Sequence, residues 1–169
     1  MIDACTSTFA DLAAVVLPEH MARLRTAMAQ PRPLAEFCIR GVGTKAILRR
    51  LGYSSDFSGC YVLLRDDKAF YVGISRAVVS RLSQHGKGKT HFDASLAYRM
   101  ACEKLPHKRT RGEAMKEPAF YQAFSDAQEL LRASKVAFIE LENPLELYLF
   151  EAYCAMQLDT CEWNIFRTH

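Results

Sequence analysis

The sequence has no run of apolar residues long enough to span a bilayer, and it has no internal repeat or low-complexity tract. Its first residues are acidic rather than basic, and Pro18 and Glu19 directly follow the apolar part, which is unlike a secretory signal. We therefore expect no membrane association and a cytoplasmic location. The length of 169 residues, 50% of them apolar, is typical of one compact domain.

The cysteines lack the spacing of a disulfide framework or a structural zinc site. None of the six forms a C-x-x-C pair, and their neighbours are mostly apolar. The closest two are Cys154 and Cys161, and no histidine is spaced to complete a zinc site with them. The pattern predicts free thiols, mostly buried.

The sequence also lacks a large net charge, since +3 is too small to indicate a nucleic-acid-binding protein by itself. The charge is unevenly distributed, because residues 76–111 are strongly basic and contain only Asp93 and Glu103 as acids. This segment can face phosphates, although a solvated helix face and a polar loop would give the same pattern. Its GKGKT stretch lacks the upstream glycine of a Walker loop, so no nucleotide site is expected there.

Apolar periodicity predicts an α+β fold. The β-branched and aromatic runs at residues 59–64 and 69–74 flank a polar turn, which is typical of a β-hairpin, and residues 135–142 predict a third strand. Helical spacing elsewhere predicts helices around a small three-stranded antiparallel sheet. We expect two parts, an N-terminal helical extension over residues 1–54 and a sheet-containing domain over residues 55–169.

Two glycines in the segment 39–51, Gly41 and Gly43, lie between two short helical stretches. The pattern resembles the G-x-G hairpin of helix-hairpin-helix modules, in which backbone N–H groups approach a DNA phosphate at a helix N-terminus. A plain helix-loop-helix that turns on its glycines gives the same pattern and is commoner. The sequence is compatible with both a helix-hairpin-helix and a plain helix-loop-helix.

Five separated positions carry a family resemblance: Gly59-Cys60-Tyr61, Tyr71-Val72-Gly73, Arg81, Glu151 and Asn164. In their order and spacing they resemble the GIY-YIG nuclease superfamily, in which the two triplets lie on neighbouring strands, the arginine on the next helix and the glutamate on a later helix. The resemblance covers roughly the last two-thirds of the chain. Cys60 replaces the usual isoleucine, and Arg76 stands where some relatives have a lysine.

The resemblance implies a divalent-metal-dependent endonuclease that hydrolyses phosphodiester bonds, in DNA rather than RNA, by a one-metal mechanism. The implied cofactor is Mg²⁺, with Mn²⁺ as a substitute, and Glu151 is its ligand. Arg81 would contact the phosphate through two donors. Glu146 is the competing ligand, but it lies nearer the helix start, where acids favour the helix dipole.

A tyrosine is implied as the base that activates water. Its ordinary pKa of about 10 means that nearby cations must assist it. We favour Tyr71 as the base and Tyr61 as its positioning partner, while His85, one turn after Arg81, can instead accept or relay the proton.

The remaining implied positions bind the substrate or support the site. Nucleic-acid contacts are expected from Arg76, Lys87 and Lys89, and structural roles near the site from Gly59, Gly73 and Asn164. His169 can fold over the site from the chain terminus.

Two other functions fit the same sequence. One is a catalytically inactive nucleic-acid-binding module of the same fold, and the other is an RNA nuclease. Strand preference, sequence specificity and protein partners do not follow from these residues.

Overall fold

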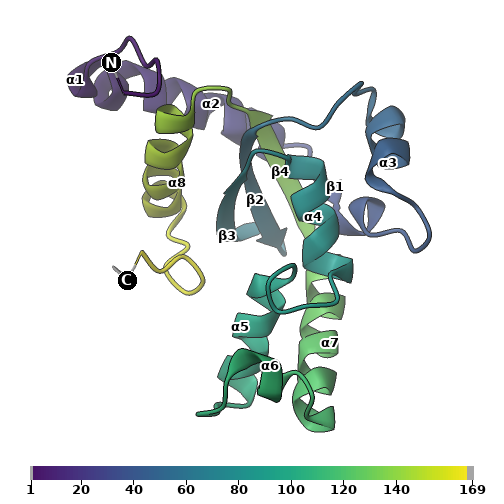
Figure 1. Cartoon of the computed structure of the whole chain (residues 1–169). Helices are drawn as coiled ribbons and strands as arrows, with labels where there is room; N and C mark the ends of the chain where they lie inside the picture. The colour runs from purple at the N-terminus through teal and green to yellow at the C-terminus, as the bar shows by residue number, and fades with distance from the viewer. Residues whose placement is uncertain (1, 167–169) are drawn as a thin grey trace. The chain divides into compact units, whose positions relative to one another are not determined.

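A computed structural model describes residues 2–166 of the chain (Figure 1), so His169 lies outside the described residues. The segments follow in the order α1 (Phe9–Asp11), a π-helical turn (Leu12–Val16), α2 (Leu17–Met28), β1 (Arg32–Pro33), a 3₁₀ helix (Leu34–Phe37), α3 (Thr44–Leu51), β2 (Gly59–Arg65), β3 (Lys68–Ser75), α4 (Val78–Lys87), α5 (Ser95–Lys104), α6 (Arg111–Ala114), α7 (Pro118–Arg132), β4 (Lys135–Glu140) and α8 (Pro144–Leu158). The α+β class predicted from the sequence is confirmed.

The chain divides into two compact units. The first contains residues 2–32, 56–78 and 135–166, and the second contains residues 33–55 and 79–134. The division differs from the boundary predicted between residues 54 and 55. The physical reason is that α2 buries its apolar face in the core of the sheet, so the N-terminal helix belongs to the same unit as the strands.

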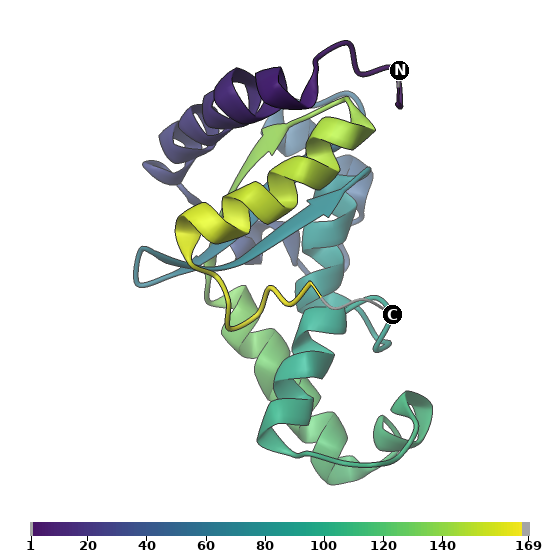
Figure 2. The same ribbon diagram turned by 90° about the vertical axis from the view of Figure 1, so that its left-hand side faces the viewer.

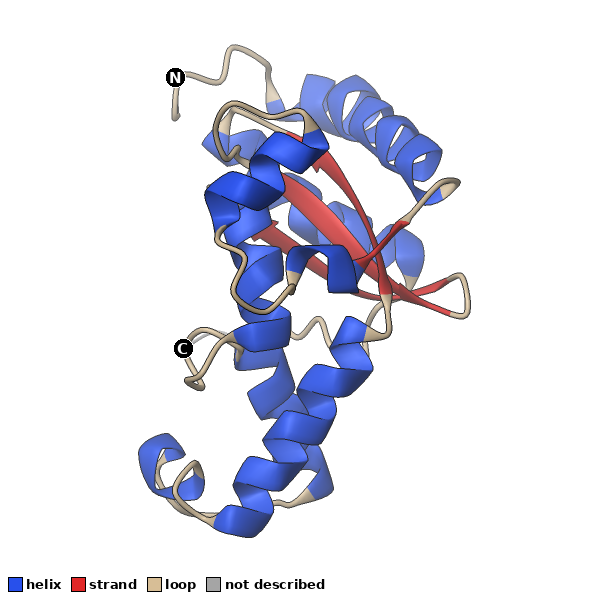
Figure 3. Ribbon diagram, turned by 90° about the vertical axis from the view of Figure 1, so that its right-hand side faces the viewer, coloured by secondary structure: helices blue, strands red, loops and turns tan. Residues whose placement is uncertain are grey.

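The sheet has four strands in the order β1-β4-β2-β3, one more than the three predicted (Figure 3). The extra strand, β1, is only Arg32–Pro33, and two residues that include a proline carry no alternating pattern. The β2–β3 hairpin turns through Asp66 and Asp67, whose φ angles of 50° and 60° are those of the tight turns that suit paired strands. Tyr61 lies opposite Gly73 in its antiparallel register.

The core of the first unit lies on one face of this sheet. Cys60 and Val62 point to this face, which α2 covers over β4 and α8 covers over β3. Figure 2 shows α8, in yellow-green, passing across the hairpin. Side chains alternate along a strand, so Tyr61 and its cross-strand neighbours point to the opposite face.

In the second unit the helices α5 and α7 pack side by side. The charged segment before α7 contains α6, where Thr110 and Glu113 form a reciprocal capping box and Ala114 is buried. The strand β3 continues to Ser75, and α4 begins three residues later at Val78.

All six cysteines are free thiols, and four of them are buried. Within residues 2–166, no helix combines the length and the apolar character needed to cross a membrane.

Candidate active site

The two tyrosines predicted as catalytic lie close together on the hairpin. Their ring centroids are 6.3 Å apart, with Tyr61 on β2 and Tyr71 on β3. Tyr61 is 1% exposed, whereas Tyr71 is only partly buried. Tyr71 is therefore the more exposed of the two residues, and its role as the base stays a prediction.

Gly73 allows this arrangement because the Tyr61 side chain lies against its backbone. A Cβ placed on Gly73 would overlap the Tyr61 hydroxyl and would lie 2.5 Å from Cζ of the same ring. Gly59 meets a comparable restriction, because a Cβ there would overlap the carbonyl oxygen of Ile139 on β4. Both glycines are therefore required by close packing across strands.

Glu151 lies in the middle of α8 and is half-buried. Burial raises the pKa of its carboxyl above the ordinary value, because an ionised carboxylate loses hydration there. Its charge is also one of the smaller causes, after burial and Cys154, that raise the pKa of the Cys60 thiol. The carboxylate thus lies near the start of β2, on the side of the sheet that α8 covers.

Asn164 fixes the open edge of β3. Its amide accepts a hydrogen bond of 2.8 Å from the Val72 N–H and donates one of 2.8 Å to the Val72 carbonyl. The side-chain amide therefore replaces a neighbouring strand at this residue, between Tyr71 and Gly73. The contact ties the segment after α8 to the strand that carries Tyr71.

Within the first unit, strand alternation separates Glu151 from the tyrosine side chains. The helix α8 covers the face that bears Cys60, whereas Tyr61 and Tyr71 point to the other face. Because β3 is the outermost strand, side chains from both faces of the sheet can reach past its edge. A site shared by Glu151 and Tyr71 would have to reach around β3, whose edge Asn164 covers at Val72.

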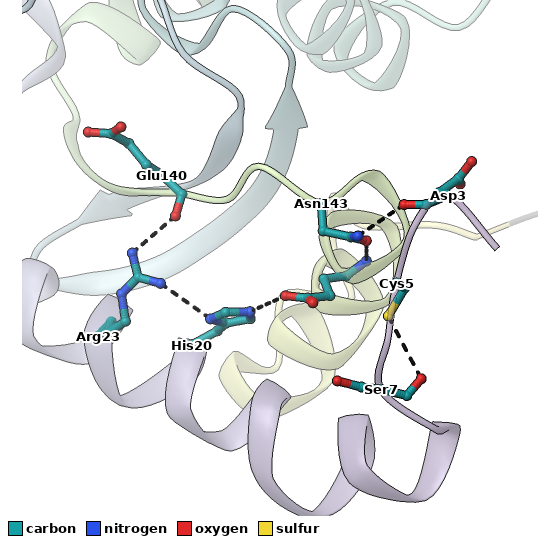
Figure 4. A network of polar contacts seen from close by, with 8 residues as sticks. Asp3, Cys5, Ser7, His20, Arg23, Glu140 and Asn143 are labelled. Carbon is teal, nitrogen blue, oxygen red and sulfur yellow. Dashed lines mark hydrogen bonds and ion pairs between the residues drawn. The ribbon is translucent and has the colours of Figure 1, made fainter. Parts of the chain in front are cut away.

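The competing glutamate, Glu146, is engaged elsewhere. Its carboxylate pairs with Nε2 of His20 on α2 at 2.9 Å. Figure 4 shows Arg23 reaching the His20 ring and the carbonyl oxygen of Glu140, contacts of 3.4 Å and 3.0 Å. This network joins α2 to the start of α8, which gives Glu146 a structural role and favours Glu151 as the metal ligand.

Arg81 belongs to the second unit, on α4. Its guanidinium donates to the carbonyl of Asp93 and to the Ser95 hydroxyl, both at 2.8 Å. A third, longer hydrogen bond of 3.4 Å goes to Oε1 of Gln84, and together these contacts hold the guanidinium. Neither the Asp93 nor the Ser95 contact was predicted from the sequence, because contacts twelve and fourteen residues away, just before α5 and at its first residue, leave no periodic signal.

His85 is fully buried in the second unit, 0% exposed. Burial and then the charge of Arg81 lower its pKa to about 3. The ring is therefore neutral at physiological pH and a very weak base, so these properties argue against the proton-accepting role considered from the sequence. Packing of α4 is the role they favour.

Of the basic residues expected to bind nucleic acid, one is hydrogen-bonded within the protein and two are exposed to solvent. Lys87 donates to the carbonyl of Val42 at 2.8 Å and approaches that of Ile39 at 3.4 Å, so its charge holds the loop before α3. That engagement argues against Lys87 as a phosphate contact. Lys89 and, in the first unit, Arg76 are exposed.

The glycine loop has one turn of 3₁₀ helix on its N-terminal side and α3 on the other. Gly41 has a φ of 76°, and Gly43 is the N-cap of α3. A full first helix is absent from this described segment, so the arrangement corresponds to the plain turn rather than to a complete helix-hairpin-helix.

Models of protein families, curated proteins and solved structures were each compared with this chain, and none of the three comparisons gave a match.

Proposed function

We propose that this chain is a divalent-metal-dependent endonuclease that cleaves phosphodiester bonds in DNA. The observation that carries the proposal is the half-buried carboxylate of Glu151, whose pKa burial raises, in the same unit as the closely packed tyrosine pair. A carboxylate held away from water is stabilised by a cation, and carboxyls with perturbed pKa values are enriched at functional sites.

The donor set fits a magnesium ion. Mg²⁺ takes oxygen ligands and keeps most of its waters, so one carboxylate such as Glu151 is sufficient protein ligation. When bound, the ion supplies positive charge to the phosphate and to the departing oxygen. Mn²⁺, which prefers the same ligands, is expected to substitute for it.

The protein residues supply the remaining chemistry. Tyr71, ionised to the phenolate, takes a proton from the attacking water as the oxygen of that water forms a bond to phosphorus and the bond to the leaving oxygen breaks. A solvent water then protonates the leaving oxygen. Tyr61, fixed against Gly73, positions the water. That Arg81 contacts the phosphate stays a prediction from the sequence.

A cleavage panel tests the proposal. Single-stranded, duplex and branched DNA, together with RNA, are incubated with Mg²⁺, Mn²⁺ or EDTA and either the wild-type protein or Glu151→Gln. We expect metal-dependent cleavage of DNA that falls by at least about 100-fold in Glu151→Gln. The matched control is Glu146→Gln on the same helix, whose cleavage should remain near wild type.

A stability measurement separates a metal ligand from a structural carboxylate. The folded-state pKa of Glu151 is raised above 4.5, so ionisation destabilises the fold as pH rises through and beyond that value. Without metal, Glu151→Gln should therefore be the more stable protein at neutral pH, and Mg²⁺ should stabilise only the wild type.

Three outcomes would contradict the proposal. DNA binding without cleavage of any substrate indicates the inactive binding module, and cleavage confined to RNA indicates the RNA nuclease. Equal cleavage by wild type and Glu151→Gln means that the site is wrong.

A further inference from the structure

A pocket of about 300 Å³ lies beside the start of α8, wholly within the first unit. Its lining includes Ile74, Ser75, Arg76, Glu142, Leu147 and Tyr148. The residues come from the end of β3, the segment after it, the loop before α8 and the first two turns of α8. This volume is at the small end of ligand sites and suits one planar ring system with its attached groups.

The walls of the pocket have three different chemical characters. Leu147 is buried and Ile74 is partly buried, so they form an apolar side. Tyr148 is 61% exposed, which leaves an aromatic ring open to a ligand. Arg76 and Glu142 are both exposed and carry opposite charges.

The aromatic ring, the apolar side and the two charges of the pocket are complementary to the base and the phosphate of a nucleotide. A base stacks on an aromatic ring whatever its identity, because every base has a π-face. A guanidinium binds phosphate oxygens through its planar donors, and the positive end of the α8 dipole, at Pro144, adds to the attraction. The Glu142 carboxylate repels a phosphate but accepts hydrogen bonds from an exocyclic amino group of a base. The two charges therefore orient a nucleotide, with its phosphate toward Arg76 and its base edge toward Glu142.

The pocket adjoins the residue assigned as the metal ligand. Glu151 follows Tyr148 by three residues and Leu147 by four on α8, and side chains at these spacings are neighbours on a helix surface. On the strand side, the pocket residue Ser75 lies two residues beyond Gly73, the partner of Tyr61. A nucleotide in the pocket is thus within one turn of Glu151 on α8, whereas Tyr61 and Tyr71 point to the other face of the sheet.

We propose that this pocket binds one unpaired nucleotide of the DNA strand being cut, with its base on Tyr148 and its phosphate on Arg76, so that the substrate has to present an unstacked base. The inference rests on the proposed nuclease function, because the strand bound in the pocket is the substrate of that nuclease. It narrows that substrate to single-stranded, branched or frayed DNA, because a base inside an intact duplex cannot reach the ring without leaving the stack.

The experiment measures binding in the Glu151→Gln background, which removes cleavage from the readout. The probes are a short single-stranded DNA with 2-aminopurine at one position and the same strand in a fully paired duplex. Stacking on Tyr148 should quench the fluorescence of the single strand. Tyr148→Ala should abolish that quenching and raise the Kd for the single strand roughly 5- to 100-fold, with little change for the duplex.

Three further variants make the result specific. Tyr148→Phe keeps the ring and should retain binding. Tyr121→Ala removes a tyrosine that is 50% exposed on α7, far in sequence from the pocket, and should bind as the parent does. Arg76→Gln should lower the slope of log Kd against log salt by roughly one phosphate contact.

The outcomes of this test are distinct from those of the cleavage panel. A Tyr148→Ala variant that binds and quenches like its parent overturns the pocket assignment, even if Glu151-dependent cleavage is found. The same holds if Tyr121→Ala loses as much affinity as Tyr148→Ala. Selective loss in Tyr148→Ala supports the nucleotide pocket, even if no cleavage is observed and the nuclease proposal fails.

Discussion

Replacing Gly73 by alanine tests how tightly the hydroxyl end of Tyr61 is packed. The added Cβ would lie 2.5 Å from Cζ and 3.0 Å from Cε1 of the Tyr61 ring, whereas carbon atoms pack best at about 3.5–4.0 Å. The ring is 1% exposed and has little free space to move into, so the overlap has to be relieved by shifting the ring or the strands. We expect Gly73→Ala to lower the free energy of unfolding by about 1–3 kcal/mol, the usual cost of overpacking a core.

Urea unfolding measures this loss, and thermal unfolding should show a decrease in Tm of about 2–4 °C for each kcal/mol. Gly112→Ala is the matched control, because a Cβ at Gly112 meets no atom within 4 Å and alanine is favoured in α6. In a Tyr61→Leu background, which removes the overlapping atoms, the cost of Gly73→Ala should largely disappear. An unchanged urea midpoint for Gly73→Ala alone would refute the packing argument.

Two other predictions concern the edge of β3 and the buried histidine. Asn164→Ala removes both hydrogen bonds to Val72 and should cost about 1–2 kcal/mol in urea unfolding, whereas Gln157→Ala on the exposed side of α8 should cost almost nothing; equal effects would mean that the edge contact is not stabilising. His85 has a folded pKa of about 3 against an ordinary 6.5, so the stability that its neutral ring provides is complete above pH 6.5 and is lost as pH falls toward 3. By pH 5 the loss should reach about 2 kcal/mol, and the NMR signal of the His85 ring should still be that of the neutral form. A His85 signal that titrates near pH 6.5 would contradict this burial.

Local patterns in the sequence were sufficient for most of the secondary structure. The β-branched and aromatic runs on either side of Asp66 and Asp67 predicted the β2–β3 hairpin, and helical spacing predicted helices elsewhere in the chain. Both depend on neighbouring residues alone, as periodicity does. The strand β1 was not predictable in this way, because two residues have no period.

Assignments that depend on long-range contacts were harder to make. A separate helical extension was expected for residues 1–54. The helix α2 instead packs against the sheet, so it belongs to the same compact unit as the strands. Lys87 looked like a phosphate contact from its basic loop, but it donates to carbonyls some 45 residues earlier in the chain. A charge count contains no information about which groups a side chain will meet after folding.

The sequence by itself determined the α+β class, the hairpin and the identity of the candidate residues, because residue types and spacings act locally. Only the tertiary structure decided how those residues differ: Tyr61 buried against Gly73, Glu146 paired with His20, and His85 neutral within the core. Burial, pKa and hydrogen-bond partners arise from residues that are distant in the chain, and folding brings those residues together.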